Sequence, residues 1–180
     1  VGIAYLFWLM LRNASDKIGR QYEKMAFRFR VHMTEPPAQL CGFIRAEPFL
    51  HGIYRDREIS LSVPGKGLQN TRQIETILKI MVNDKSFKWQ MTATGLFGGM
   101  RQRDSGIKQR WSSGDSVFDT AVDVRTNNDE RLRRILDSAR LDEIRDILKG
   151  SKASISLRDG VLYFSEFGLI ADDIKRERFE

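Results

Sequence analysis

The sequence is poor in the residues that build disulfides, metal centres and nucleophilic sites, since it has one cysteine, Cys41, and two histidines, His32 and His51. A single cysteine cannot form an internal disulfide, so we expect the chain to fold in a reducing compartment such as the cytoplasm. A structural zinc site normally needs four ligands, and these three residues do not supply them. Two histidines also leave little scope for a Ser-His catalytic pair.

Phosphate-binding and cofactor-binding motifs are missing as well. The stretch Gly95–Gly99 lacks the Gly-Lys-Ser/Thr ending of a phosphate loop and the Gly-x-Gly-x-x-Gly of a dinucleotide fold. Asp115, Asp119 and Asp123 are regularly spaced but lack the pattern of a calcium loop, so helix-capping and turn roles are predicted for them. We therefore expect a non-catalytic protein with no cofactor and no metal.

What the chain does contain is an ordinary globular composition, with 41% hydrophobic and 30% charged residues in 180 positions. This composition and length predict one folded domain with an appendage. The basic excess lies in one part of the chain. Residues 1–110 hold 18 Lys and Arg against 9 Asp and Glu, whereas residues 111–180 hold 12 against 15. The first part is thus predicted to face an anionic surface, either lipid headgroups or nucleic acid.

The N-terminal stretch Val1–Leu11 is uncharged and ends at Arg12. Eleven residues are too few to span a bilayer, which takes roughly 20 apolar residues in a helix. Because the chain begins at Val rather than Met, we interpret the stretch as part of a transmembrane anchor, with a buried core helix as the alternative. The residues expected to contact the membrane are Tyr5, Leu6, Phe7, Trp8, Leu9, Met10 and Leu11.

An amphipathic helix is predicted to follow over Asp16–Val31, with Ile18, Tyr22, Met25 and Phe29 at helical spacing. Positive charge beside a membrane span marks its cytoplasmic side, so lipid headgroups are the expected contacts of the basic residues here, with a solvated helix face as the alternative. These headgroup-binding candidates are Arg12, Lys17, Arg20, Lys24 and Arg28. Pro36 and Pro37 then separate an anchor region, residues 1–35, from a soluble domain, residues 36–180.

Short extended segments dominate the predicted domain. Gly52–Val63 indicates a hairpin with a turn near Asp56, and Phe87–Ala93 alternates between apolar and polar residues as a strand does. Strands are also expected over Ile74–Val82 and at Val122 and Val124, whereas residues 95–114 are predicted to form a long loop.

The remainder of the predicted domain combines helix and hairpin. A helix capped by Asn127 or Asn128 is expected to bury Leu132, Ile135, Leu136 and Ala139, and its apolar stripe continues to Leu148. Asp159-Gly160 favours a two-residue type I′ turn. The predicted fold class is therefore α+β: a mixed, mainly antiparallel sheet with one or two packed helices, preceded by the N-terminal membrane-anchor helix.

Three segments taken in order resemble a known family. These are the hairpin His51–Leu61 with its turn Tyr54-Arg55-Asp56-Arg57, the stretch Ser113–Asp119, and the stretch Leu157–Phe164. Together they are similar to a widespread family of uncharacterised bacterial proteins with one or two N-terminal transmembrane helices, in which Pro often stands where this chain has Ser116. The resemblance covers residues 40–170 and implies a membrane-linked bacterial domain without indicating an activity.

Two functions follow as hypotheses. The first is a non-catalytic accessory or scaffold subunit, held at the membrane, whose cytoplasmic domain docks onto a larger membrane complex such as a respiratory or photosynthetic one. Its expected partners are membrane lipids and the other subunits. The alternative is a nucleic-acid-binding module, because a basic loop with an adjacent aromatic can follow phosphates and stack a base. The anion-binding candidates in that loop are Arg101, Arg103, Lys108, Arg110 and Trp111.

Overall fold

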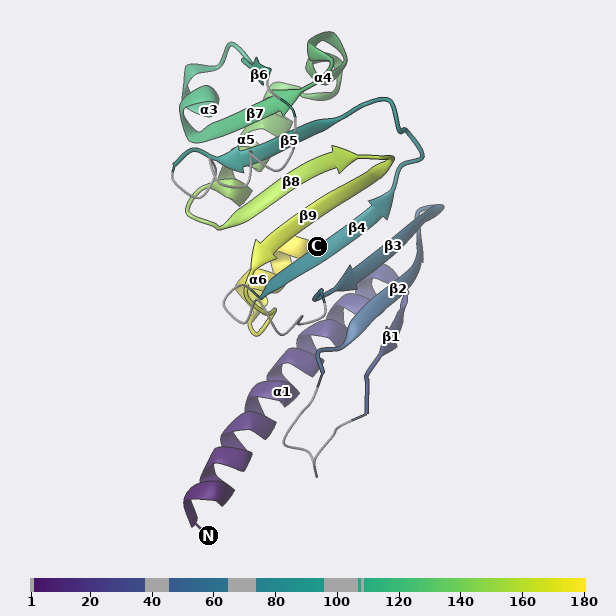
Figure 1. Ribbon diagram of the computed structural model, residues 1–180, viewed down its shortest axis with the longest axis vertical. Coiled ribbons are helices and arrows are strands. Elements are labelled where there is room, and N and C mark those ends of the chain that lie inside the picture. The colour runs from purple at the N-terminus through teal and green to yellow at the C-terminus, as the bar shows by residue number, and fades with distance from the viewer. Residues whose placement is uncertain (1, 38–45, 65–73, 96–106, 108) are drawn as a thin grey trace. The chain divides into compact units, whose positions relative to one another are not determined.

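The computed structural model describes residues 2–37, 46–64, 74–95, 107 and 109–180 of the chain (Figure 1). The chain divides into two compact units. The first comprises Val1–Leu78 together with Gly168–Glu180, and the second comprises Lys79–Phe167. Strand β4 (Glu75–Met81) carries the chain from the first unit into the second.

The first unit combines a long helix with short antiparallel strands. Its elements are α1 (Gly2–Phe29), β1 (His32–Thr34), β2 (Phe49–Tyr54), β3 (Arg57–Ser62), the beginning of β4, and α6 (Asp173–Phe179). The strands are ordered β1-β2-β3-β4, and β2 pairs antiparallel with both β1 and β3. After the chain returns from the second unit, the Gly168 amide donates to the Ile74 carbonyl at 2.7 Å, which ties α6 to the start of β4.

The core of the first unit lies between α1 and the inner face of the strands. Leu50, Ile59 and Leu61 are buried on β2 and β3, and Tyr22, Met25 and Phe29 are buried on α1. The Phe29 ring meets the Tyr54 ring edge-on at 5.2 Å. Among the side chains of α1 that the structure describes, those buried in this core lie in the second half of the helix. The N-terminal turns run beyond the strands of the unit (Figure 1).

In the described residues, the second unit is an antiparallel sheet accompanied by helices. Its strands are β5 (Trp89–Ala93), β6 (Arg110–Trp111), β7 (Val122–Thr126), β8 (Ala153–Arg158) and β9 (Val161–Phe167), ordered β9-β8-β5-β7-β6. The helices are α3 (Ser116–Ala121), α4 (Asp129–Ile135) and α5 (Ser138–Leu148). Met91, Val124, Leu132 and Leu148 are almost fully buried and mark its core.

Local sequence signals explain several of these elements. Asn128 caps α4 by accepting from the Arg131 amide, so the predicted cap is confirmed. Asp159 and Gly160 both have positive φ, 53° and 79°, which confirms the type I′ turn between β8 and β9. The hairpin expected over Gly52–Val63 is confirmed as β2 and β3, with positive φ at Arg55 and Asp56.

The predicted helix after Asn128 is wrong in its extent, because the chain breaks between α4 and α5. Leu136 has left the helical region of φ and ψ, and Asp137 starts a new helix by accepting from the Arg140 amide. Ile135, which we expected to be buried, is 41% exposed. The Asp137 side chain thus begins a second helix inside a continuous apolar stripe.

The predicted fold class, a mixed sheet with one or two packed helices behind a membrane anchor, is wrong. Apart from a single parallel bridge between Glu75 and Gly168, the strand pairs whose register is described run antiparallel, and the described residues form five helices.

The expected transmembrane anchor is also contradicted. Within the described segments, no helix combines enough length with enough apolar residues to cross a membrane. Helix α1 is 28 residues long, but its apolar part ends at Arg12, and Asp16 and Lys17 follow within the next turns. The predictions of a transmembrane helix and of a membrane location with the domain on the cytoplasmic side are therefore wrong.

Candidate docking surface on the N-terminal helix

Helix α1 is fixed to its unit by its second half. Gln21, Tyr22, Met25 and Phe29 recur at helical spacing and are buried. Burial raises the pKa of the Tyr22 phenol to about 12, because the anionic form would lose its hydration. The second half of α1 is therefore an ordinary core helix, as its amphipathic pattern predicts.

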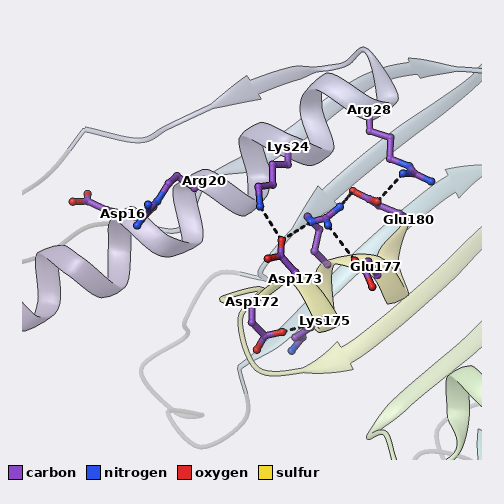
Figure 2. Close-up of polar contacts among 10 residues, drawn as sticks. Asp16, Arg20, Lys24, Arg28, Asp172, Asp173, Lys175, Glu177 and Glu180 are labelled. Carbon is purple, nitrogen blue, oxygen red and sulfur yellow. Dashed lines mark hydrogen bonds and ion pairs between the residues drawn. The ribbon is translucent and has the colours of Figure 1, made fainter.

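Ion pairs with α6 also hold this half in place (Figure 2). The Lys24 ammonium lies 2.8 Å from Asp173, and an Arg28 guanidinium nitrogen lies 3.2 Å from Glu180. Arg176 lies 3.4 Å from Asp173 and also pairs with Glu180. One continuous series of ion pairs therefore links Lys24, Asp173, Arg176, Glu180 and Arg28. Two of the residues expected to bind headgroups, Lys24 and Arg28, are thus placed against α6.

Helix α6 is positioned for this contact by its own cap. The Asp172 side chain accepts from the Lys175 amide at 2.8 Å, and the buried Lys175 ammonium donates to the Gly168 carbonyl at 2.6 Å. The first bond satisfies an amide that the start of a short helix would leave without a partner, and the second ties α6 to the segment before it. They also fix Asp173, in the first turn, toward α1.

The first half of α1 is exposed and apolar. Exposure is 86% for Ile3, 60% for Leu6 and 70% for Met10, and Tyr5, Leu9 and Leu11 are also exposed. Tyr5 stacks on Trp8 with ring centres 6.0 Å apart. Of Phe7, only the backbone belongs to the described part of the chain. At 100° per residue these side chains lie on every side of the helix, so no polar face is left toward water.

Basic residues border this apolar surface. The Arg12 guanidinium lies over the Trp8 ring at 5.3 Å from its centre, and the Arg20 Nε donates to the Asp16 carbonyl at 3.3 Å. Within the described residues, neither Arg12 nor Lys17 forms an ion pair. We call the exposed apolar turns, Ile3–Leu11, together with Arg12 and Lys17, the N-terminal docking surface.

A cavity of about 790 Å³ adjoins α1 one turn further along. Its lining is charged with both signs, and it lies between α1 and the segments 35–37 and 46–48. Among the described residues, the charged side chains of the lining are those of Asp16, Arg20, Glu23 and Glu35. These four are exposed, so they are not desolvated as catalytic groups commonly are.

The basic loop of the alternative hypothesis is described only in part. Arg101, Arg103 and Lys108 lie outside the described residues. Arg110 lies 3.5 Å from Asp123 and donates to the Asp119 carbonyl at 3.1 Å. Trp111 is only 4% exposed, and the Arg133 guanidinium covers its ring. A base cannot stack on a ring in this position.

Two of the three acidic residues have the capping and turn roles expected from the sequence, whereas Asp123 lies on β7, 3.5 Å from Arg110. Asp115 caps α3 by accepting from the Val117 and Phe118 amides. Asp119 accepts from the Ser112 hydroxyl and from the Ser113 hydroxyl and amide, and although burial opposes the charge, these bonds lower the pKa of its carboxyl. Within the described segments, no group of three or more His, Cys, Asp or Glu side chains is placed to hold a metal ion.

Comparisons with known proteins do not assign the chain to a family. No family model matches the chain, and no curated protein matches it either. The resemblance carried by the three short segments accordingly stays a prediction.

Proposed function

We propose that the chain is a non-catalytic docking protein whose N-terminal docking surface inserts into an apolar groove of a protein partner. One observation carries the proposal. The first half of α1 exposes large apolar side chains on all sides, whereas its second half is a well-packed core helix. A helix that is apolar all round is stable in an enclosed site, and large exposed apolar patches mark interaction surfaces.

The size of the surface supports a protein partner. Six large side chains are exposed on these turns. At on the order of 100 Å² each, they approach the roughly 800 Å² that each side of a standard protein–protein interface buries. Insertion of a helix into a groove is a recurrent mode of peptide recognition, and its anchors lie at i, i+3, i+4 and i+7.

Charge identifies the chemistry of that partner. Arg12 and Lys17 follow the apolar turns without ion pairs among the described residues, so a groove with carboxylates at its rim complements them. A second copy of this chain complements them poorly, because parallel association of two such helices brings like charges together. The proposed partner is therefore a different protein with an apolar groove and an acidic rim.

The experiment that tests the proposal uses a photo-crosslinking amino acid in the full chain, expressed in cells of its source. The probe replaces Leu6, and the matched control replaces Phe27, which is 89% exposed on the packed half of the same helix. We expect a partner crosslinked from position 6 and not from position 27, and we expect the crosslinked peptide to be apolar with Asp or Glu nearby.

Reconstitution with the purified partner completes the test. Leu6→Ser combined with Met10→Ser should abolish binding, and Arg12→Glu should weaken it, whereas Phe27→Ser should leave it unchanged. Crosslinks from position 6 only to a second copy of the chain or only to lipid would refute the proposal. Equal crosslinking from positions 6 and 27 would also refute it.

A further inference from the structure

The two histidines of the chain, 19 positions apart, lie directly opposite each other on neighbouring strands. His32 on β1 is the register partner of His51 on β2. Their ring centres are 5.9 Å apart, and the rings are inclined by 36°. Directly opposed residues of an antiparallel pair project from the same face of the sheet, so the two imidazoles share one site.

This site lies on the outer face of the first unit's strands. Leu50 and Gly52, the neighbours of His51 along β2, face inward. Leu50 is buried, and a Cβ on Gly52 would lie 2.9 Å from Val31. His32 and His51 are both exposed, so an ion can reach this face of the strands from solvent. The Phe49 ring, on the same face, lies 5.7 Å from the His51 ring and restricts its orientation.

We propose that His32 and His51 form a two-imidazole binding site for a late divalent transition metal, Cu²⁺ or Zn²⁺, with water completing the coordination. Imidazole nitrogen is a preferred ligand of these ions, and Cu²⁺ binds most tightly in the first-row series. With Zn–N bonds of about 2.0–2.1 Å, two imidazoles on one ion have ring centres roughly 5.2 Å apart at a tetrahedral angle and roughly 4.5 Å apart at a right angle. The observed 5.9 Å is slightly longer, so metal binding needs only a small rotation of the two side chains toward each other.

Metal binding at this position joins β1 to β2. Strand β1 is three residues long and is the first in the strand order of its unit. A ligand that binds only the folded arrangement stabilises it by mass action, so a bound ion holds this short edge strand in register. This inference is independent of the proposed docking function, because no residue of the N-terminal docking surface takes part.

The chain allows a sharp test, because His32 and His51 are its only imidazoles and Cys41 is its only thiol. Metal-free full-length protein is titrated with Zn²⁺ by calorimetry and with Cu²⁺ by electron paramagnetic resonance. We expect one equivalent of each ion to bind, with two coupled imidazole nitrogens on Cu²⁺. His32→Ala and His51→Ala should each leave one imidazole nitrogen and weaken the affinity for Zn²⁺ by about tenfold or more, since even an outer-sphere change costs that much.

Three controls separate this site from other binding. Thr34→Ala, two residues along β1, and Cys41→Ser should both leave the affinity for Zn²⁺ unchanged. His32→Gln keeps a polar side chain in the exposed position, so it loses the ligand without disturbing the strand. Binding that persists in the double variant of His32 and His51, or that depends on Cys41 alone, would overturn the proposal.

Discussion

The Lys24 ammonium on α1 lies 2.8 Å from the Asp173 carboxylate on α6, although 149 positions separate the two residues. The hydrogen bond from Lys24 and its charge lower the pKa of Asp173 below its ordinary value of 3.8. Both side chains are more than half exposed, so salt screens the pair. The contact fixes the helix that carries the docking surface to the end of the chain.

The first prediction concerns the pH dependence of this contact. A carboxyl with a lower pKa in the folded state stabilises the fold above its unfolded pKa, and the effect is lost as the pH falls through the folded value. Asp173→Asn should therefore lower the Tm near neutral pH, and the difference from the unmodified protein should shrink below a pH of about 4. Glu143→Gln on α5, an exposed carboxylate without an ion pair among the described residues, controls for the lost charge. A difference that stays constant down to acid pH would contradict this account.

The second prediction concerns the close approach of β2 to the segment after α1. A Cβ at Gly52 would lie 2.9 Å from Val31 Cγ1 and 3.3 Å from its Cα. Gly52→Ala should destabilise the protein by about 1–3 kcal/mol, as overpacking does, in urea unfolding. Val31→Ala removes Cγ1, so the double variant should recover part of the loss. Equal losses in the single and double variants would show that the clash is with Val31 Cβ and Cα rather than with Cγ1.

The third prediction separates two costs at the turn between β8 and β9. Gly160 has φ of 79°, and a Cβ there would lie 3.4 Å from the Asp84 amide and 3.3 Å from Lys85 Cγ. Gly150 has φ of 71° but has nothing within 4 Å of the same position. Gly150→Ala should cost about 1 kcal/mol from backbone strain, and Gly160→Ala about 1–3 kcal/mol from strain and contact together. Similar unfolding midpoints for the two variants would refute the added contact.

Features encoded within a few neighbouring residues could be predicted from the sequence. The turn at Asp159-Gly160 and the cap at Asn128 are such features. A turn with positive φ, or a cap on a helix-end amide, depends on the identity of only one or two residues. The break at Asp137 is predictable by the same argument, since Asp is a good capping residue. The continuous apolar stripe, however, indicated one uninterrupted helix.

Features that depend on register or on distant segments could not be predicted. Spacing along the chain does not show that His32 meets His51, because a shift of one residue in the pairing would place the two rings on opposite faces. The ion pair between Lys24 and Asp173 likewise depends on where α6 packs in the first unit. The apolar character of Ile3–Leu11 is visible in the sequence, but no helix in the described part of the chain is long and apolar enough to cross a membrane.

The last prediction tests whether the two halves of α1 differ in stability as they differ in packing. Leu6 and Met10 are 60% and 70% exposed, whereas Met25 is fully buried on the same helix. Leu6→Ser with Met10→Ser should change the free energy of unfolding by no more than about 0.5 kcal/mol per site, while Met25→Ala should cost about 2–5 kcal/mol. The double variant should also bind less of a hydrophobic fluorescent dye, because it removes apolar surface that the folded protein exposes. Urea unfolding and dye titration measure the two effects on the same samples. If the double variant lost as much stability as Met25→Ala, the first half of α1 would be packed in solution and unable to serve as a docking surface.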